Sequence, residues 1–136
     1  MRAILDTNIL VSALIAPVGA PGFLYQLWRT GGFALLSCEE QFEEFRRVTR
    51  YPRLRKYLRP AAAGAMLNEI RVLAELAGPL PKVDVCADPA DNFLRAMSEA
   101  GKADYLVTGD GRHLLNLERH GSTRIVTARQ AVAILG

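Results

Sequence analysis

The sequence has few of the residues that build disulfide frameworks and zinc sites. It holds two cysteines, Cys38 and Cys86, two histidines, His113 and His120, and no Cys-x-x-Cys pair. The histidines stand seven positions apart, which is not the ligand spacing of a structural zinc site. The sequence therefore lacks the residues that a disulfide-stapled domain or a zinc module requires. We therefore expect reduced thiols in a cytoplasmic protein.

Long apolar runs are also missing. No segment approaches the roughly 20 apolar residues that a membrane-spanning helix requires. The apolar N-terminal stretch is interrupted by Asp6 and Asn8, which argues against a signal peptide. The 136 residues are 50% apolar and contain no repeat or low-complexity segment. We expect a single domain over residues 1–136 that makes no membrane contact.

The sequence instead contains short apolar runs that alternate with amphipathic helical patterns. The runs predict strands at residues 3–5, 33–36, 105–107 and 124–126, with a weaker extended segment at 83–86. The intervening patterns predict helices from Asp6 to Gly31 with an interruption at 17–22, from Ser37 to Pro52, over 60–77, from Asp88 onward, and over 128–135. Strands this apolar leave neither face in water. The pattern therefore predicts an α/β fold, a three-layer α/β/α sandwich with a central, mainly parallel sheet.

Two aspartates follow predicted strands. Asp6 comes directly after strand 3–5, and Asp110 ends the Thr108-Gly109-Asp110 turn after strand 105–107. In open parallel sheets, ligands bind beyond the carboxyl ends of the strands. The competing interpretation is local, with Asp6 as a helix cap and Asp110 as a turn residue. Two acids at one sheet edge favour a shared site.

Helical phase distinguishes two neighbouring glutamates. The helix that begins at Ser37 is expected to bury Phe42, Phe45 and Val48. At about 100° per residue, Glu44 then borders the core whereas Glu43 faces water. Glu44 could reach the same crevice, although a surface salt bridge to Arg47 is its alternative role.

Two other aspartates, Asp88 and Asp91, are also candidates for this site. Asp88, before Pro89, suits the N-cap of a helix. Asp91, in the first turn, is then available for the crevice or for a capping box. Asp104 begins the strand that Asp110 follows, so it should lie more than about 10 Å from that edge.

Four carboxylates that converge on one crevice repel one another unless they share protons or bind a cation. The four are Asp6, Glu44, Asp91 and Asp110. Oxygen ligands without histidine or cysteine suit Mg²⁺ or Mn²⁺ rather than zinc. Such an ion can lower the pKa of a bound water and stabilise charge during phosphodiester hydrolysis.

A block of seven basic residues follows Glu44 without an intervening acid. It comprises Arg46, Arg47, Arg50, Arg53, Arg55, Lys56 and Arg59. The block is a candidate surface for the phosphates of a nucleic acid, the contacts being expected from all but Arg59. Its alternative is a solvated helix face and loop.

Several segments together resemble a PIN domain, and more narrowly the bacterial toxins of type II toxin–antitoxin pairs. These segments are "ILDTNILVSAL", "EEFRRVTRYPRL", "DPADNFLRAMSEAGKADYLVTGDGRHLL" and the terminal strand–helix pattern. The resemblance implies a three-layer fold and a divalent-metal-dependent ribonuclease. It places the family's acidic quartet on Asp6, Glu44, Asp91 and Asp110, with Thr108 and Asn8 in support. It also implies a homodimer and a cognate antitoxin.

Our leading hypothesis is a Mg²⁺- or Mn²⁺-dependent endoribonuclease. In it Asp6, Asp91 and Asp110 hold the metal, and Glu44 assists binding or positions the attacking water. One alternative is a phosphatase with Asp6 as nucleophile, although Asn8 stands where that class usually offers a second aspartate. The other is a non-catalytic module that binds a nucleic acid or a partner, in which the acids only cap helices.

Overall fold

The fold is built around a six-stranded sheet with the order β3-β2-β1-β4-β6-β5. The computed structural model describes residues 1–78, 80, 89–109 and 118–136, and the side chains of all of these except 89–92. The strands are β1 (Arg2–Leu5), β2 (Ala34–Ser37), β3 (Glu75–Leu76), β4 (Tyr105–Val107), β5 (Arg119–His120) and β6 (Thr123–Val126). All pairings are parallel except β5 with β6. The predicted segment at 83–86 and the predicted cap Asp88 lie outside the described residues.

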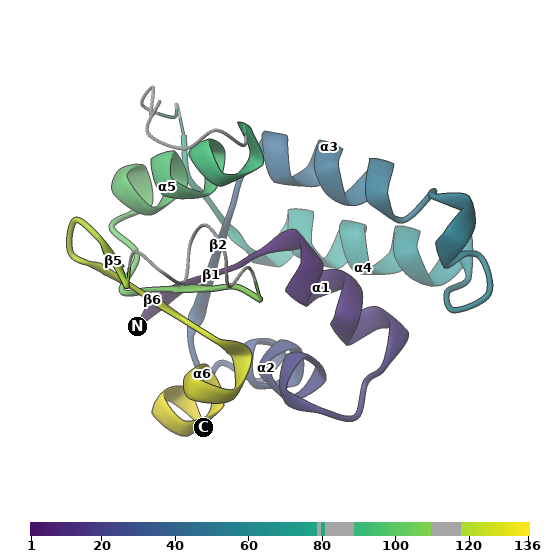
Figure 1. The fold of residues 1–136 in the computed structure, drawn as a ribbon, viewed down its shortest axis with the longest axis horizontal. Coiled ribbons are helices and arrows are strands. Elements are labelled where there is room, and N and C mark those ends of the chain that lie inside the picture. Colours follow the sequence, from purple (N-terminus) through teal and green to yellow (C-terminus); the bar gives the residue numbers. More distant parts are fainter. Residues whose placement is uncertain (79, 81–88, 110–117) are drawn as a thin grey trace.

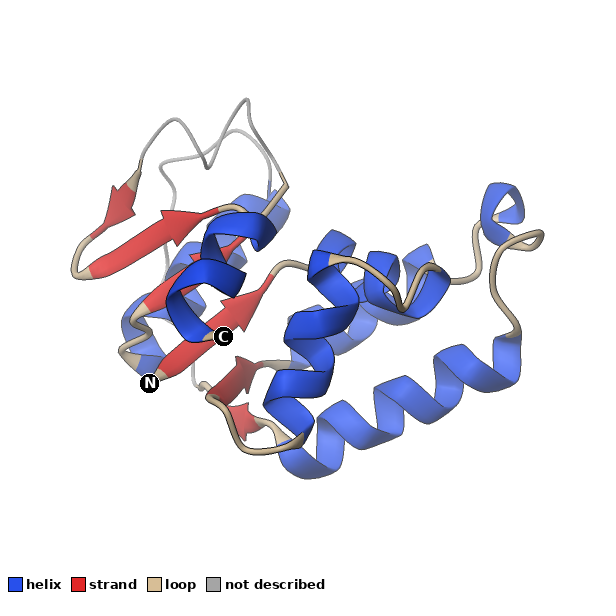
Figure 2. Cartoon of the chain, turned by 90° about the horizontal axis from the view of Figure 1, so that it is seen from below, coloured by secondary structure: helices blue, strands red, loops and turns tan. Residues whose placement is uncertain are grey.

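Six α-helices and one 3₁₀ turn are described around the sheet. They are α1 (Thr7–Ile15), α2 (Ala20–Arg29), α3 (Glu39–Val48), the 3₁₀ turn η1 (Pro52–Leu54), α4 (Pro60–Leu73), α5 (Pro89–Gly101) and α6 (Ala128–Leu135). Figure 1 shows α5 on one side of the sheet and α2 and α6 on the other. Figure 2 shows from below that two long helices reach beyond the strands. We call α3, α4 and their connection the α3–α4 arm.

The core consists of two apolar layers, one on each face of the sheet. Alternate residues of β1 point to opposite faces, as the period of a strand requires. Ala3 and Leu5 pack with α1, α2, α6 and the α3–α4 arm, whereas Ile4 packs with Leu94 and Met97 of α5. The predicted three-layer α/β/α architecture with a mainly parallel sheet is confirmed.

The register of the central strands fixes the edge at which a site can form. Leu5 of β1 lies opposite Val107 of β4, and Val107 lies opposite Val126 of β6. These three parallel strands therefore end at the same edge. The next residues along the chain, Asp6 and Thr108, begin the loops there.

The predicted elements are wrong at two boundaries. The helix predicted over 60–77 ends at Leu73, because Ala74 adopts an extended conformation (φ −75°, ψ 153°) and residues 75–76 pair with β2. Ser37, predicted to begin a helix, is the last residue of β2, and α3 begins at Glu39. Strand β5 was not predicted from the sequence.

Within the described residues, no single helix is long and apolar enough to cross a membrane. The adjacent helices α1 and α2 satisfy the length and composition criteria only when taken together, and they are bent by 98° relative to each other.

Candidate active site

The centre of the site is Asp6, which joins β1 to α1. Its backbone N–H donates to the carbonyl of Val107 at 2.9 Å, so it continues the β1–β4 ladder. Its carboxylate accepts a hydrogen bond from Oγ1 of Thr108 at 2.7 Å. Both side chains are buried. The side chain of Asp6 makes no hydrogen-bonded cap to α1, although the backbone amides of Thr7 and Asn8, in the first turn of that helix, act to lower its pKa.

The surroundings of Asp6 oppose its negative charge. Burial raises the pKa of Asp6 above its usual value, and the charge of Glu44 raises it further. The Thr108 hydrogen bond and the backbone amides of Asn8 and Thr7 act in the opposite direction without cancelling the rise. A cation beside the two carboxylates would remove both unfavourable effects.

Glu44 approaches Asp6 from α3. Its side chain is 12% exposed, against 68% for the neighbouring Glu43, which is the difference that helical phase predicts. The described ion pair of Glu44 is with Nη2 of Arg47, at 4.0 Å, and that side chain is 64% exposed. An exposed pair at this distance contributes little. A surface salt bridge therefore does not account for the partly buried Glu44.

A buried polar contact, not predicted from the sequence, fastens α3 to the end of β1. Nε2 of Gln41 donates to the carbonyl of Leu5 at 2.7 Å. Oε1 of the same side chain accepts from Oγ of Ser37 at 2.6 Å. Gln41 precedes Glu44 by one helical turn and Leu5 precedes Asp6, so this contact sets the separation of the two acids. The signal in the sequence is a glutamine on the apolar face of a helix.

The other predicted site residues are described in part. Asn8 is exposed, in the first turn of α1 beside Asp6. Asp91 falls in the first turn of α5, where its backbone alone is described, and Asp110 lies outside the described residues. Asp104 accepts from the backbone N–H of Arg2 at 2.8 Å. Arg2 begins β1, so Asp104 lies at the opposite end of the strands, as predicted.

The oxygen donors at this edge fit a hard divalent cation. Two carboxylates, from Asp6 and Glu44, and one hydroxyl, from Thr108, meet without a sulfur or imidazole ligand among the described side chains. Mg²⁺ and Mn²⁺ prefer such ligands. In the part of the chain that the structure describes, no three acidic, histidine or cysteine side chains form a complete metal site. Asp91 and Asp110 are the predicted remaining ligands.

Cys38 takes no part in this chemistry. It lies at the N-cap position of α3 and is buried. Burial raises the pKa of its thiol to about 11, so the thiol stays protonated and unreactive at neutral pH.

The basic block covers the outer part of the α3–α4 arm. Arg47, Arg50, Arg53, Arg55, Lys56 and Arg59 are exposed, and Arg46 is partly exposed. The described ion pairs include two members of the block, Arg46 with Glu43 at 3.4 Å and Arg47 with Glu44 at 4.0 Å. The arm, whose helix α3 carries Glu44, thus presents positive charge to solvent.

The fold and the site define a class of protein: a three-layer α/β/α domain whose acidic side chains meet beyond the carboxyl ends of β1 and β4. Comparison with known families assigns the chain within that class. The sequence profile of the PIN domain matches residues 2–112, and the chain belongs to the PIN domain family.

The chain is also similar to two known proteins. The "Uncharacterized protein MJ1680" of Methanocaldococcus jannaschii is 28% identical over 111 residues, which are 81% of this chain and 71% of that protein. A crystal structure of VapBC2 from Rickettsia felis, bound to a DNA fragment from its promoter, contains a chain with the same fold. The TM-score is 0.59 at 14% identity, over 93% of this chain and 98% of that chain.

Proposed function

We propose that this chain is a divalent-metal-dependent endoribonuclease that hydrolyses RNA phosphodiester bonds. The observation that carries the proposal is the buried Asp6, which a threonine hydroxyl holds beside a second carboxylate. Membership of the PIN domain family supports nuclease activity in general. The basic α3–α4 arm supplies the attraction that a polyanionic substrate needs.

The proposed roles rest on the described positions of Asp6, Asn8, Glu44 and Thr108, and on the sequence resemblance for Asp91 and Asp110. Asp6, Asp91 and Asp110 would hold Mg²⁺ or Mn²⁺, which would supply an activated water and stabilise charge on the phosphate. Thr108 fixes the rotamer of Asp6 through its hydrogen bond. Glu44 assists in holding the cation or orients the attacking water by accepting its proton. Asn8 supports the first acid from the exposed side of α1.

The test is cleavage of labelled single-stranded and structured RNA by the purified chain in Mg²⁺, Mn²⁺ or chelator. Cleavage should require the metal, and Asp6→Asn should abolish it while leaving the circular dichroism spectrum unchanged. Asp104→Asn, an acid at the opposite end of the strands, is the matched control and should stay active.

Two results would contradict this function. Full activity in Asp6→Asn would remove Asp6 from the chemistry. Salt-dependent RNA binding without cleavage, unaffected by Asp6→Asn, would indicate a binding module instead.

The proposal extends to a toxin of a toxin–antitoxin pair that acts in the cytoplasm as a homodimer. The sequence resemblance supports it, as does the Rickettsia felis neighbour, whose structure contains VapBC2. Induced expression in a bacterial host should arrest growth, and Asp6→Asn should relieve the arrest. Light scattering of the purified chain tests the dimer separately.

A further inference from the structure

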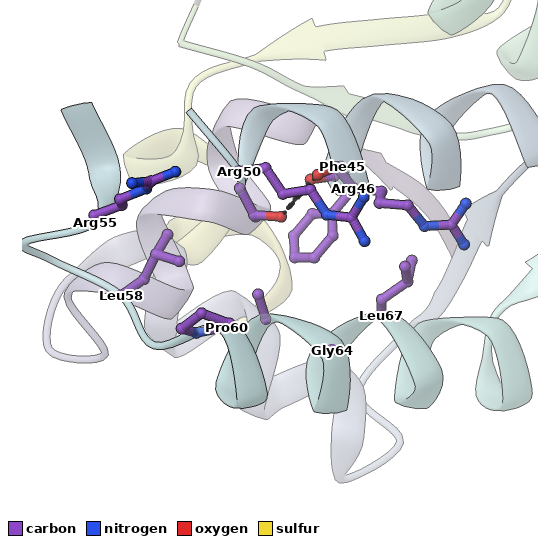
Figure 3. Close-up of a pocket in the computed structure, with 10 residues that line it drawn as sticks. Phe45, Arg46, Arg50, Arg55, Leu58, Pro60, Gly64 and Leu67 are labelled. Carbon is purple, nitrogen blue, oxygen red and sulfur yellow. Dashed lines mark hydrogen bonds between the residues drawn. The ribbon is translucent and has the colours of Figure 1, made fainter. Parts of the chain in front are cut away.

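The α3–α4 arm contains a cavity that the acidic site does not use. It has a volume of about 560 Å³, within the roughly 300–1,000 Å³ of pockets that hold small molecules. Phe45, Leu58 and Leu67 supply apolar walls, and Arg46, Arg50 and Arg55 are the charged lining residues. Figure 3 shows Arg46 on α3 and Arg50 just beyond the end of that helix, across the cavity from α4, and Arg55 further along the connecting segment.

The charge of the cavity has one sign. No aspartate or glutamate is among its described lining residues. The described ion pairs include none to Arg50 or Arg55, and the pair of Arg46 with Glu43 is exposed and 3.4 Å long. The three arginines therefore line one cavity with little local compensation of their charge. An occupant must bring negative charge together with an apolar or aromatic surface.

A glycine of α4 lies on the wall of this cavity. A Cβ added to Gly64 would meet no atom within 4 Å, and its φ is not positive. Glycine inside a helix costs about 1 kcal/mol relative to alanine. A side chain larger than alanine at this position would occupy part of the cavity, whereas alanine would leave it open.

The cavity and the acids lie on different sides of α3. At about 100° per residue, Glu44 points away from the direction shared by Phe45, Arg46, Thr49 and Arg50. An α-helix with its side chains is about 10–12 Å across. A ligand that reaches both places must extend around α3, as a nucleic-acid strand of a few nucleotides can.

We infer that this cavity binds one unstacked nucleotide of the RNA, away from the phosphate that is cleaved. The base enters between the apolar walls, and the flanking phosphates pair with Arg46, Arg50 and Arg55. Proteins recognise single-stranded RNA in this way, by stacking splayed bases on aromatic or guanidinium planes and pairing cations with the backbone. A nucleotide brings an apolar base and negative phosphates in one ligand, which matches both the apolar walls and the arginines. The inference rests on the proposed RNA substrate.

The test is a binding measurement in chelator, where the proposed cleavage does not occur. Fluorescence anisotropy compares a short single-stranded oligoadenylate with a duplex of the same length. Gly64→Leu should weaken single-strand binding about tenfold, since loss of one stacked base costs about 1–3 kcal/mol, and should leave duplex binding unchanged. Gly64→Ala, which gives the same relief of helix strain without filling the cavity, should bind as the wild type does.

A second pair of variants guards against a folding defect in Gly64→Leu. Arg50→Gln removes a charge inside the cavity, and Arg53→Gln removes one from the same arm outside it. The first should weaken single-strand binding more than the second. In the cleavage reaction Arg50→Gln should raise KM and leave kcat unchanged, because the cavity is remote from the acids.

The outcomes separate this inference from the proposed function. Single-strand binding that survives both Gly64→Leu and Arg50→Gln would overturn the cavity assignment, while metal-dependent cleavage would still support the nuclease. A wild-type chain that neither binds nor cuts RNA would overturn both. A polyglutamate peptide whose binding is lost in Gly64→Leu, when RNA binding is not, would assign the cavity to a protein partner.

Discussion

Among single residues, Asp6 is held in an environment that disfavours its charge. The carboxylate is buried, Glu44 lies near, and the Thr108 hydroxyl with the backbone amides of Thr7 and Asn8 offsets the unfavourable environment only in part. A group chosen for stability alone would be uncharged at this position, because burying a charge without a counter-charge is costly. The arrangement is useful only if a cation is recruited to it. Asp6 therefore links the stability of the domain to its proposed chemistry.

Asp6→Asn should stabilise the metal-free protein at neutral pH. The pKa of Asp6 in the folded chain lies above its ordinary value of 3.8, so the folded state binds the proton more tightly than the unfolded state. Stability is lost as the pH rises from that ordinary value through the raised pKa, and the loss is complete once the pH exceeds the raised pKa. In chelator at pH 8 the variant should melt at a higher temperature than the wild type.

Thermal melts across pH and metal concentration measure this effect. The difference between variant and wild type should vanish at pH 3, where the carboxylate is protonated in both states. Added Mn²⁺ should raise the melting temperature of the wild type and leave the variant unmoved. An Asp6→Asn protein that is less stable than the wild type at every pH would contradict the assigned electrostatics.

The adjacent glutamates provide a second comparison. Glu44→Gln should lower the rate of RNA cleavage by about 10²–10⁴, the usual contribution of a positioned acid–base group. Glu43→Gln should retain the rate within about twofold, because its side chain is exposed and its one described partner is Arg46. Equal rates for the two variants would place Glu44 outside the chemistry.

Among the elements, the contact between β1 and α3 determines whether the two acids meet. Both polar atoms at the end of Gln41 are used, and the side chains of Gln41 and Ser37 are fully buried. A satisfied buried network restricts a helix more narrowly than apolar packing does, because a rotation or slip would break hydrogen bonds that water cannot replace.

Gln41→Leu should destabilise the fold by about 1–3 kcal/mol, because it leaves the Ser37 hydroxyl and the Leu5 carbonyl without their partner. Denaturant unfolding measures the loss, and the exposed Gln26→Leu should change it by less than about 0.5 kcal/mol. Ser37→Ala in the Gln41→Leu background should cost less than it does alone. Strict additivity would show that the two side chains do not act as a unit.

The elements also show what the sequence could predict and where it could not. Strands at 3–5, 105–107 and 124–126 are buried apolar runs bounded by turn residues. Helix 128–135 begins with a capping box at Thr127. Local signals of this kind suffice to predict an element from the sequence. Strands β3 and β5 have two residues each and exist only through pairing with a neighbour. The Gln41 contact likewise depends on a carbonyl 36 positions earlier, whereas the approach of Glu44 followed from helical phase.

In the whole molecule, charge is distributed unevenly. The net charge is +3, yet seven cations lie in one block on the α3–α4 arm, which extends beyond the sheet (Figure 1). Because the net charge is small and the arm is strongly positive, a polyanion is attracted to this one face of the domain. The proposed RNA binding then combines two kinds of contact. The cavity arginines hold one nucleotide, and the surface cations attract the phosphate backbone of the rest of the strand.

Removal of surface cations should therefore flatten the salt dependence of RNA binding without changing catalysis. Each phosphate contact on a single strand contributes about −0.7 to the slope of log affinity against log salt. Substitution of Arg53, Lys56 and Arg59 by glutamine should reduce that slope by about 1.4, the contribution of the two expected contacts, Arg53 and Lys56. The rate at saturating RNA should be unchanged, because none of the three lies beside Asp6 or Glu44.

The control removes the same number of charges from another part of the surface. Lys102, Arg124 and Arg129 are exposed and lie outside the arm. Their substitution by glutamine lowers the net charge equally. If both triple variants flatten the slope alike, RNA is attracted by the net charge and the arm has no special part in binding. If only the arm variant does so, the connection between α3 and α4 directs the RNA backbone toward the acids.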